Sequence, residues 1–215
     1  MTTGEAPAFD DGFRERLADL IAWRRDVRRF RTDPIPPEQV RRLLALAALS
    51  PSVGNSQPWR FVLVEDPDTR RAARDCSLAA NAAAAETYEG ERAALYRSLK
   101  LEGMAEAPVH IAAFCDEETP VGCGLGRMTM PETLSYSVAG AIATLWLAAR
   151  AEGLGLGWVS ILDPARVHAL LGVPASWRLV GYLCLGRPVE EHDDPELVRA
   201  GWQDRLPFDD MVLTR

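Results

Sequence analysis

Hydrophobic residues recur every three or four positions near the start of the chain, a spacing that gathers them on one face of a helix. The pattern predicts an amphipathic helix from Asp11 to about Arg25, with its apolar stripe against a core. Pro36 and Pro37 favour the first turn of a second helix, and Pro51 helps to end it. The stripe of the first helix consists of Phe13, Leu17, Leu20 and Ile21.

Short runs rich in β-branched, aromatic and other large apolar residues follow, and they predict four buried strands. These strands cover residues 61–64, 109–115, 158–162 and 179–185. Helices are expected at about residues 67–105, at about residues 135–152 and, in a short element, after Asp163-Pro164. Strands separated by helices predict a layered sheet with helices packed around it.

Charge and targeting signals narrow the class of protein. The formal net charge of -7 argues against non-specific binding to nucleic acid, whose phosphates are held by clustered cations. Residues 1–11 carry acidic side chains and no apolar core, so we expect no targeting peptide and a cytoplasmic protein. The longest apolar run, residues 138–149, is too short to cross a bilayer, so no membrane association is expected.

Cysteine and histidine do not form a recognisable metal or disulfide pattern. The cysteines lack C-x-x-C spacing and the histidines are scattered, so we expect neither a disulfide framework nor a metal site. The residues concerned are Cys76, Cys115, Cys123, Cys184, His110, His168 and His192.

No repeat or low-complexity linker divides the chain, so we expect one domain over residues 1–215, with residues 1–10 disordered. The tail, residues 187–215, is polar and contains several prolines. It still carries large apolar side chains but has little room for a core of its own, so we predict that it embraces a second copy in a homodimer. Those side chains are Leu197, Trp202, Leu206 and Phe208.

Two glycine clusters raise the possibility of a nucleotide-binding loop. A Rossmann fingerprint needs a third glycine for close helix packing, but Arg127 and Trp158 occupy the required positions. The chain also lacks a G-K-[ST] tripeptide, which excludes a P-loop. We therefore expect neither kind of site.

Five arginines surround a single carboxylate, Asp26, between Arg24 and Arg31. Arg24 and Arg28 are four residues apart, so a helical turn would aim their guanidinium groups at one phosphate. The alternative is a solvated basic helix end that the helix dipole favours. The cluster alone does not decide between them.

A second element, residues 51–59, reads P-S-V-G-N-S-Q-P-W and offers donors and acceptors suited to a flat heteroaromatic ring. Such a loop is often only a turn. Together, however, R-R-x-x-R-x-F at Arg24–Phe30 and this loop resemble the FMN signature of the nitroreductase superfamily. The resemblance implies FMN binding and an α+β fold, with a mixed, mainly antiparallel sheet flanked by helices and a dimer-forming C-terminal extension.

Most members of that superfamily carry serine at the third position of the basic motif, where this chain has Asp26. The motif with Asp26 and several later blocks together resemble the 5,6-dimethylbenzimidazole synthase family, over about residues 24–208. These blocks are residues 90–92, 96–103, 145–153, 155–161, 201–202 and 205–207. The resemblance implies an enzyme in which O2 and reduced FMN react and FMN is fragmented, giving the lower ligand of vitamin B12 and erythrose 4-phosphate. It also implies a separate NAD(P)H flavin reductase as the source of reduced FMN.

The same resemblance assigns roles to individual residues. Cleavage of the ribityl chain needs a base, and we assign Asp26 as the acid/base; the alternative is that Asp26 only pairs with arginine. Neighbouring arginines should lower its pKa. Ser160, on a strand beside glycines, is the second catalytic candidate, unless it is an ordinary strand serine. The expected FMN-binding residues are Arg24, Arg25, Asp26, Val27, Arg28, Ser52, Gly54, Ser56, Gln57, Arg92, Leu101, Ser160 and Arg205.

Two other functions stay open on the sequence. The first is an NAD(P)H-dependent FMN oxidoreductase that keeps its flavin and reduces a nitroaromatic, a quinone or cob(II)yrinic acid a,c-diamide; Asp26 in place of serine argues against it. The second is a non-catalytic flavin carrier. Consumption of FMN in air distinguishes both from the flavin-fragmenting enzyme.

Overall fold

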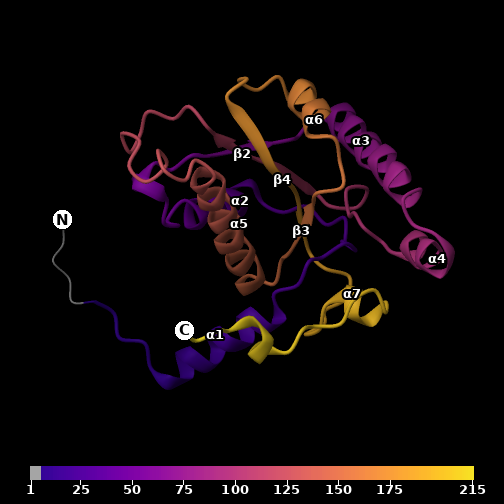
Figure 1. The fold of residues 1–215 in the computed structure, drawn as a ribbon, viewed down its shortest axis with the longest axis horizontal. Helices are drawn as coiled ribbons and strands as arrows, with labels where there is room; N and C mark the ends of the chain where they lie inside the picture. Colours follow the sequence, from indigo (N-terminus) through magenta and orange to yellow (C-terminus); the bar gives the residue numbers. More distant parts are fainter. Residues whose placement is uncertain (1–5) are drawn as a thin grey trace.

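A computed structural model describes residues 6–215, and Figure 1 shows the arrangement of its elements. Four antiparallel strands form one sheet in the order β1-β2-β4-β3. The strands are β1 (Trp59–Leu63), β2 (Val109–Asp116), β3 (Gly155–Val159) and β4 (Trp177–Gly186). The α-helices are α1 (Asp11–Trp23), α2 (Pro37–Ala47), α3 (Pro67–Ala85), α4 (Gly90–Ser98), α5 (Thr133–Ala151), α6 (Pro164–Leu171) and α7 (Glu196–Arg199). Two 3-10 turns, η1 (Val53–Asn55) and η2 (Phe208–Met211), complete the set.

The central strand β2 shows how the sheet is buried on both faces. Side chains along a strand alternate between faces. Ile111 and Ala113 pack in the cluster that contains α2 and α5, whereas Ala112 and Phe114 pack with α3 and α6 on the other face. Helices therefore cover both faces of the sheet, and the expected layered α+β fold is confirmed (Figure 1).

Two expected elements differ from the structure. The helical sequence expected at about residues 67–105 forms two helices, α3 and α4; Gly90, with a φ of +56°, begins the second, which ends at Ser98, short of the expected end. The strand expected at residues 158–162 is β3, three residues earlier, and Ser160 lies just after its end. Glycines obscured this strand in the sequence, but Gly155 pairs with Gly186 in the sheet.

The basic segment, residues 24–31, is not helical. Helix α1 ends at Trp23, and Arg24 is already extended, with a ψ of 108°. Beyond it the Val27 amide donates to the carbonyl of Leu156 at 3.1 Å, and Phe30 forms a bridge with Pro188. The expected helical alignment of Arg24 and Arg28 is therefore wrong: sheet-like pairing with the edge strand β3 replaces the helix.

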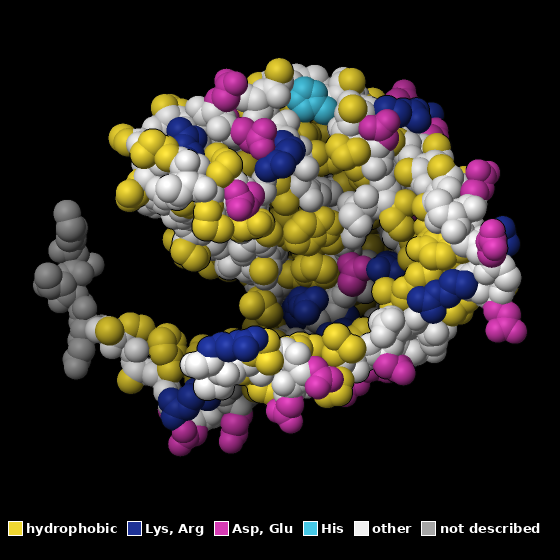
Figure 2. All heavy atoms as spheres, in the orientation of Figure 1, with side chains coloured by type: hydrophobic (Ala, Val, Ile, Leu, Met, Phe, Trp, Pro, Cys, Tyr) yellow, Lys and Arg dark blue, Asp and Glu magenta, His cyan; other side chains and the backbone are white. Residues whose placement is uncertain are grey.

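The apolar stripe of α1 does not contribute to the core of its own chain. No residue of α1 is buried, and Leu17 and Ile21 are 40% and 51% exposed. In the tail, Phe208 and Leu213 are also strongly exposed. Figure 2 shows a hollow between the layer that holds α1 and the tail and the body of the molecule, with hydrophobic side chains along its walls. The expectation that the stripe faces a core within the chain is thus not met.

Two further expectations concern membrane spans and disorder at the N-terminus. Among residues 6–215, no helix combines the length and apolar character that a membrane span requires. Disorder was expected for residues 1–10, but residues 1–5 lie outside the described part of the chain. Residues 6–10 have neither helix nor strand, and Asp10 caps α1 through the amide of Phe13.

Candidate active site

Asp26 lies beside the edge strand β3, and both of its carboxylate oxygens are occupied. The Trp158 amide donates to Oδ1 at 2.9 Å. Arg28 contacts Oδ2 through Nε at 3.0 Å and Nη2 at 2.8 Å. The Asp26 side chain keeps 28% of its exposure, so one edge of the carboxylate is open to a ligand. An ionised carboxylate accepts about four hydrogen bonds, so Oδ1, with one donor, retains a lone pair, whereas Oδ2 already has two donors.

The balance of charge and burial at Asp26 differs from the expectation. Burial disfavours the ionised form and raises the pKa of Asp26, whereas Arg28 and the Trp158 amide act in the opposite direction. The net shift is upward. The predicted lowering of the pKa by arginines is therefore wrong, because desolvation outweighs the attraction of Arg28.

Glycines in β3 allow the Asp26 segment to approach the sheet. A Cβ on Gly157 would lie 2.2 Å from the carbonyl oxygen of Val27, and one on Gly155 would lie 2.6 Å from a Val27 methyl group. Neither distance is possible for a larger residue without a shift of the backbone. We expected these glycines to permit a close approach, and the group that approaches them is Val27 of the same chain.

Three arginines stand close together on one side of this segment. Burial, followed by the charges of Arg24 and Arg205, lowers the pKa of Arg25. The Nε atom of Arg25 is buried without a hydrogen-bond partner. With Asp26 and Arg28, these residues line a cavity of about 240 Å³. Like charges in such proximity, with an unused donor, are the features of a site for an anion.

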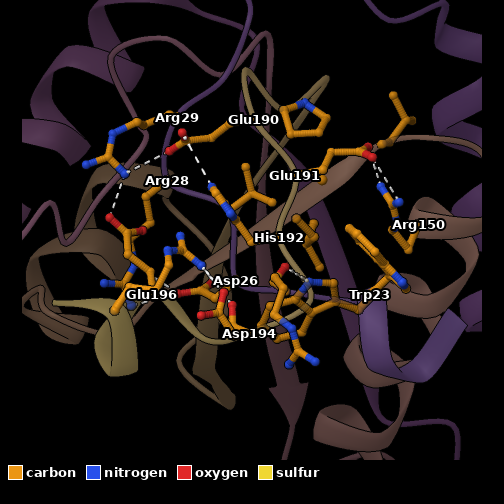
Figure 3. A pocket seen from close by; sticks show the side chains of 18 residues that line it. Trp23, Asp26, Arg28, Arg29, Arg150, Glu190, Glu191, His192, Asp194 and Glu196 are labelled. Carbon is orange, nitrogen blue, oxygen red and sulfur yellow. Dashed lines mark hydrogen bonds and ion pairs between the residues drawn. The ribbon is translucent and has the colours of Figure 1, made fainter. Parts of the chain in front are cut away.

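On its other side the same segment faces an acidic strap, residues 188–196, and Figure 3 shows the pocket between them. Two arginines of this pocket have carboxylate partners. Arg29 pairs with Glu196 at 2.5 Å, and Arg150 pairs with Glu191. Arg25 lines both cavities, while Arg24 and Arg205 line only the one of about 240 Å³.

Ser160 and Leu101 lie near the same end of β3. Ser160 is exposed and comes two residues after Trp158, whose amide holds Asp26. The loop after α4 reaches this region through Arg28, whose Nη1 donates to the carbonyl of Lys100 at 3.1 Å. Leu101 then lines a cavity of about 200 Å³ that also contacts Ile161. One chain thus brings Asp26, Arg28, Leu101 and Ser160 into one neighbourhood.

Arg92 is in a different environment. Its guanidinium lies 3.7 Å from the ring centroid of Trp202, which also packs against Tyr88 and Tyr96. The contact fastens α4 to the C-terminal tail. Arg92 therefore has a visible structural role, and its assignment to FMN stays a prediction.

The loop at Ser52–Gln57 holds a strained conformation. Asn55 and Gln57 have φ values of 52° and 45°, which side-chain-bearing residues seldom adopt. The Gln57 amide donates to Oγ of Ser52 at 3.0 Å. Ser56 is 2% exposed, and its Oγ has no hydrogen-bond partner. The assignment of this loop to FMN stays a prediction, and the strain and the unused buried hydroxyl are the observations that bear on it.

This loop and Asp26 attach to different ends of α5. The Val53 amide donates to Oγ of Ser137, near the first turn of the helix. Trp146, nine residues later, donates from Nε1 to the carbonyl of Arg25 at 3.0 Å. At a rise of 1.5 Å per residue, the two attachments are roughly 13 Å apart along the helix. The two halves of the sequence signature do not meet in one chain.

The structure also shows participants that sequence reasoning missed. Trp158 contributes a backbone amide and Lys100 a carbonyl, and neither role depends on the identity of the side chain. Trp146 does contribute its side chain. A tryptophan in a helix otherwise rich in alanine and leucine was the available signal.

The chain is similar to several known proteins. The model of the Nitroreductase family matches residues 21–187. A 5,6-dimethylbenzimidazole synthase of Rhodospirillum rubrum is 59% identical over 96% of this chain and 97% of its own length. One of Rhodobacter capsulatus is 49% identical over 93% and 96%, respectively. A crystal structure of oxidized iodotyrosine deiodinase bound to FMN and 3-iodo-L-tyrosine superposes with a TM-score of 0.68 at 28% identity, covering 82% of this chain and 91% of that one.

Proposed function

Because the chain belongs to the nitroreductase family, we propose that it binds reduced FMN and converts it with O2 into 5,6-dimethylbenzimidazole and erythrose 4-phosphate. The chain is an enzyme, and its two reported synthase relatives support formation of 5,6-dimethylbenzimidazole as its activity. The observation that carries the proposal is Asp26, held at the end of β3 beside the clustered Arg24, Arg25 and Arg205, where the buried Nε of Arg25 has no hydrogen-bond partner.

The site residues fit FMN in charge and in hydrogen bonding. The phosphate carries up to two negative charges, and Arg24, Arg25 and Arg205 supply the compensating cations around one cavity. The unused Nε of Arg25 supplies a donor. Reduced FMN, when bound, provides the electrons for O2 and the carbon skeleton of the product.

Asp26 acts as the acid/base in this proposal. Its raised pKa makes it a stronger base than an exposed carboxylate, and the Trp158 amide fixes its orientation. Arg28 opposes the upward shift and favours the ionised form, which would accept a proton from the ribityl chain. Arg24 and Arg25, which line the same cavity as Asp26, would hold the phosphate, and Asp26 would then face the ribityl chain.

Ser160 is the second catalytic residue that we propose. Its exposed hydroxyl, just beyond β3, is free to donate to the flavin ring system or to the reacting oxygen. The loop at Leu101 closes the same end of the strand. In this proposal the arginines would bind the phosphate end of the substrate, and Ser160 and the Leu101 loop would lie at its ring end.

We further propose a homodimer in which the site is completed by the second copy. Leu17 and Ile21 of α1 and Phe208 of the tail expose apolar surface that one chain leaves uncovered. The hollow in Figure 2 is the space that a second copy would fill. Within that dimer, the Ser52–Gln57 loop of one copy would approach the Asp26 segment of the other. A monomeric mass by light scattering contradicts this.

Reduced FMN is proposed to come from a separate NAD(P)H flavin reductase. In that arrangement the enzyme needs only reduced flavin and O2. Chemically reduced FMN should then support product formation without NAD(P)H. Strict dependence on NAD(P)H would contradict the separate supply.

The proposal is tested with Asp26→Asn, which keeps the size of the side chain but removes its basicity. Flavin binding should persist, while formation of 5,6-dimethylbenzimidazole falls by about 100-fold or more. Asp33→Asn is the matched control, because Asp33 also pairs with an arginine two residues away, Arg31, but at the surface. Equal product yields from Asp26→Asn and Asp33→Asn would remove Asp26 from the chemistry.

A further inference from the structure

We propose that Trp146 on α5 is a positioning residue that holds Arg24 toward the flavin phosphate and fixes the backbone that leads into Asp26. The inference rests on the proposed function, since it takes the arginine cluster as the phosphate site. Trp146 touches the basic segment in two chemically different ways, through the face of its ring and through its indole N–H.

The first contact is with the side chain of Arg24. The guanidinium carbon lies 4.8 Å from the ring centroid of Trp146, within the range of a cation–π interaction. An arginine side chain is long and flexible, so a free Arg24 would have to be ordered when a phosphate binds. Stacked on the ring, its donors are already gathered beside Arg25 and Arg205.

The second contact is with the backbone. Nε1 of Trp146 donates at 3.0 Å to the carbonyl of Arg25, which belongs to the peptide bond leading into Asp26. The following residues are tied to β3 through Oδ1 of Asp26 and the amide of Val27. Three successive residues are thus fixed at three points, and Trp146 supplies the point nearest α1.

The support for Trp146 comes from a rigid element. Its neighbours Ile142, Leu145 and Ala149 on α5 are fully buried against the sheet. The indole itself is only partly buried, and its ring centroid is 6.3 Å from that of Trp158. Trp146 therefore links the core to Arg24, which lines the arginine cavity, rather than filling the core.

A purely structural tryptophan and a positioning tryptophan predict different results for two flavins. FMN carries the phosphate and riboflavin lacks it, so the ratio of their Kd values measures the contribution of the phosphate. Titrations of the purified protein with oxidised FMN and with riboflavin, followed by flavin fluorescence, give this ratio. Loss of Arg24 positioning changes the ratio, whereas general loosening of the fold weakens both flavins equally.

Trp146→Leu removes the ring and the N–H, and we expect it to lower the riboflavin-to-FMN ratio of Kd values by about fivefold. Arg24→Gln should lower the ratio at least as much, and the double variant should lower it no further than Arg24→Gln alone. Trp177→Leu is the matched control, since Trp177 also lies near an arginine, Arg60 at 5.9 Å, but away from the basic segment. It should leave the ratio unchanged.

Trp146→Phe keeps an aromatic face and loses only the N–H. It should preserve most of the ratio while lowering kcat for 5,6-dimethylbenzimidazole, and it carries the test if Trp146→Leu does not fold. An unchanged ratio in Trp146→Leu, or unchanged kcat and ratio in Trp146→Phe, overturns the positioning role. If Arg24→Gln leaves the ratio unchanged while Asp26→Asn still abolishes product, the positioning role of Trp146 fails and the proposed function stands.

Discussion

The backbone amide of Trp158 donates a hydrogen bond of 2.9 Å to Oδ1 of Asp26, so the edge strand β3 holds the candidate base in place. The contact requires the two backbones to lie close together. Gly157, one residue earlier, makes this possible, because its bare Cα faces the carbonyl of Val27. The position of Asp26 therefore depends on glycine as much as on any polar partner.

Gly157→Ala should separate these two backbones. The new Cβ would lie 2.2 Å from the Val27 carbonyl oxygen, and overpacking of this kind costs about 1–3 kcal/mol. We expect lower stability in chemical denaturation and a large loss of product formation. Gly140→Ala is the control, because a Cβ there meets nothing within 4 Å and the helix should gain about 0.5–1 kcal/mol. Full activity in Gly157→Ala would show that close approach is not required.

The pH dependence of product formation should report the ionisation of Asp26. Burial raises the pKa of Asp26, and a base works only when ionised, so activity should fall as the pH drops through a value above the ordinary 3.9 or so. Arg28 opposes this shift. Arg28→Gln should therefore move the acid limb of kcat/KM to higher pH, whereas Arg31→Gln should not. An acid limb unmoved by Arg28→Gln contradicts the assignment.

Ser160→Ala should separate binding from chemistry. The hydroxyl is exposed at the end of β3, and loss of one well-placed donor to a reacting group costs about 100-fold in rate. FMN binding should change little, since the arginines hold the phosphate. Ser98→Ala, which removes another exposed hydroxyl, is the control. A wild-type rate in Ser160→Ala would reduce Ser160 to an ordinary loop serine.

The stability of the fold should depend on His110, away from the active site. Burial lowers the pKa of His110 to about 4, and Nδ1 lies 3.0 Å from the hydroxyl of Tyr182. The unfolded chain binds its proton near pH 6.5, so the fold is fully stabilised above that pH and loses about 3 kcal/mol as the pH falls through 4. Melting temperatures across this range test the prediction. His110→Gln should flatten the dependence, and the surface variant His168→Gln should retain it.

Several features of the fold could be predicted because local pattern determined them. Pro37 and Pro67 each begin a helix, and Gly153, with a φ of +71°, follows the end of α5. The strands at β1, β2 and β4 also lie near their expected positions. Periodicity and turn chemistry were sufficient for these elements.

Other features depended on contacts between distant segments. The arginines around Asp26 were expected on a helix, but pairing with Leu156 extends the chain there. The pKa of Asp26 was expected to fall, since charge is visible in a sequence and burial is not. The stripe of α1 was correctly seen as apolar, yet none of its residues is buried within the chain. The sequence thus identified Asp26 as a candidate, but it did not predict the backbone conformation or the burial around it.

The most direct test supplies the purified protein with reduced FMN in air, using FMN labelled with carbon-13 at ribityl C1'. The account predicts that FMN disappears and that 5,6-dimethylbenzimidazole appears only with the protein, with the label at C2 by mass spectrometry. Asp26→Asn should yield none. Recovery of intact FMN, with NAD(P)H oxidised only when an electron acceptor is added, would contradict flavin fragmentation and indicate a conventional reductase.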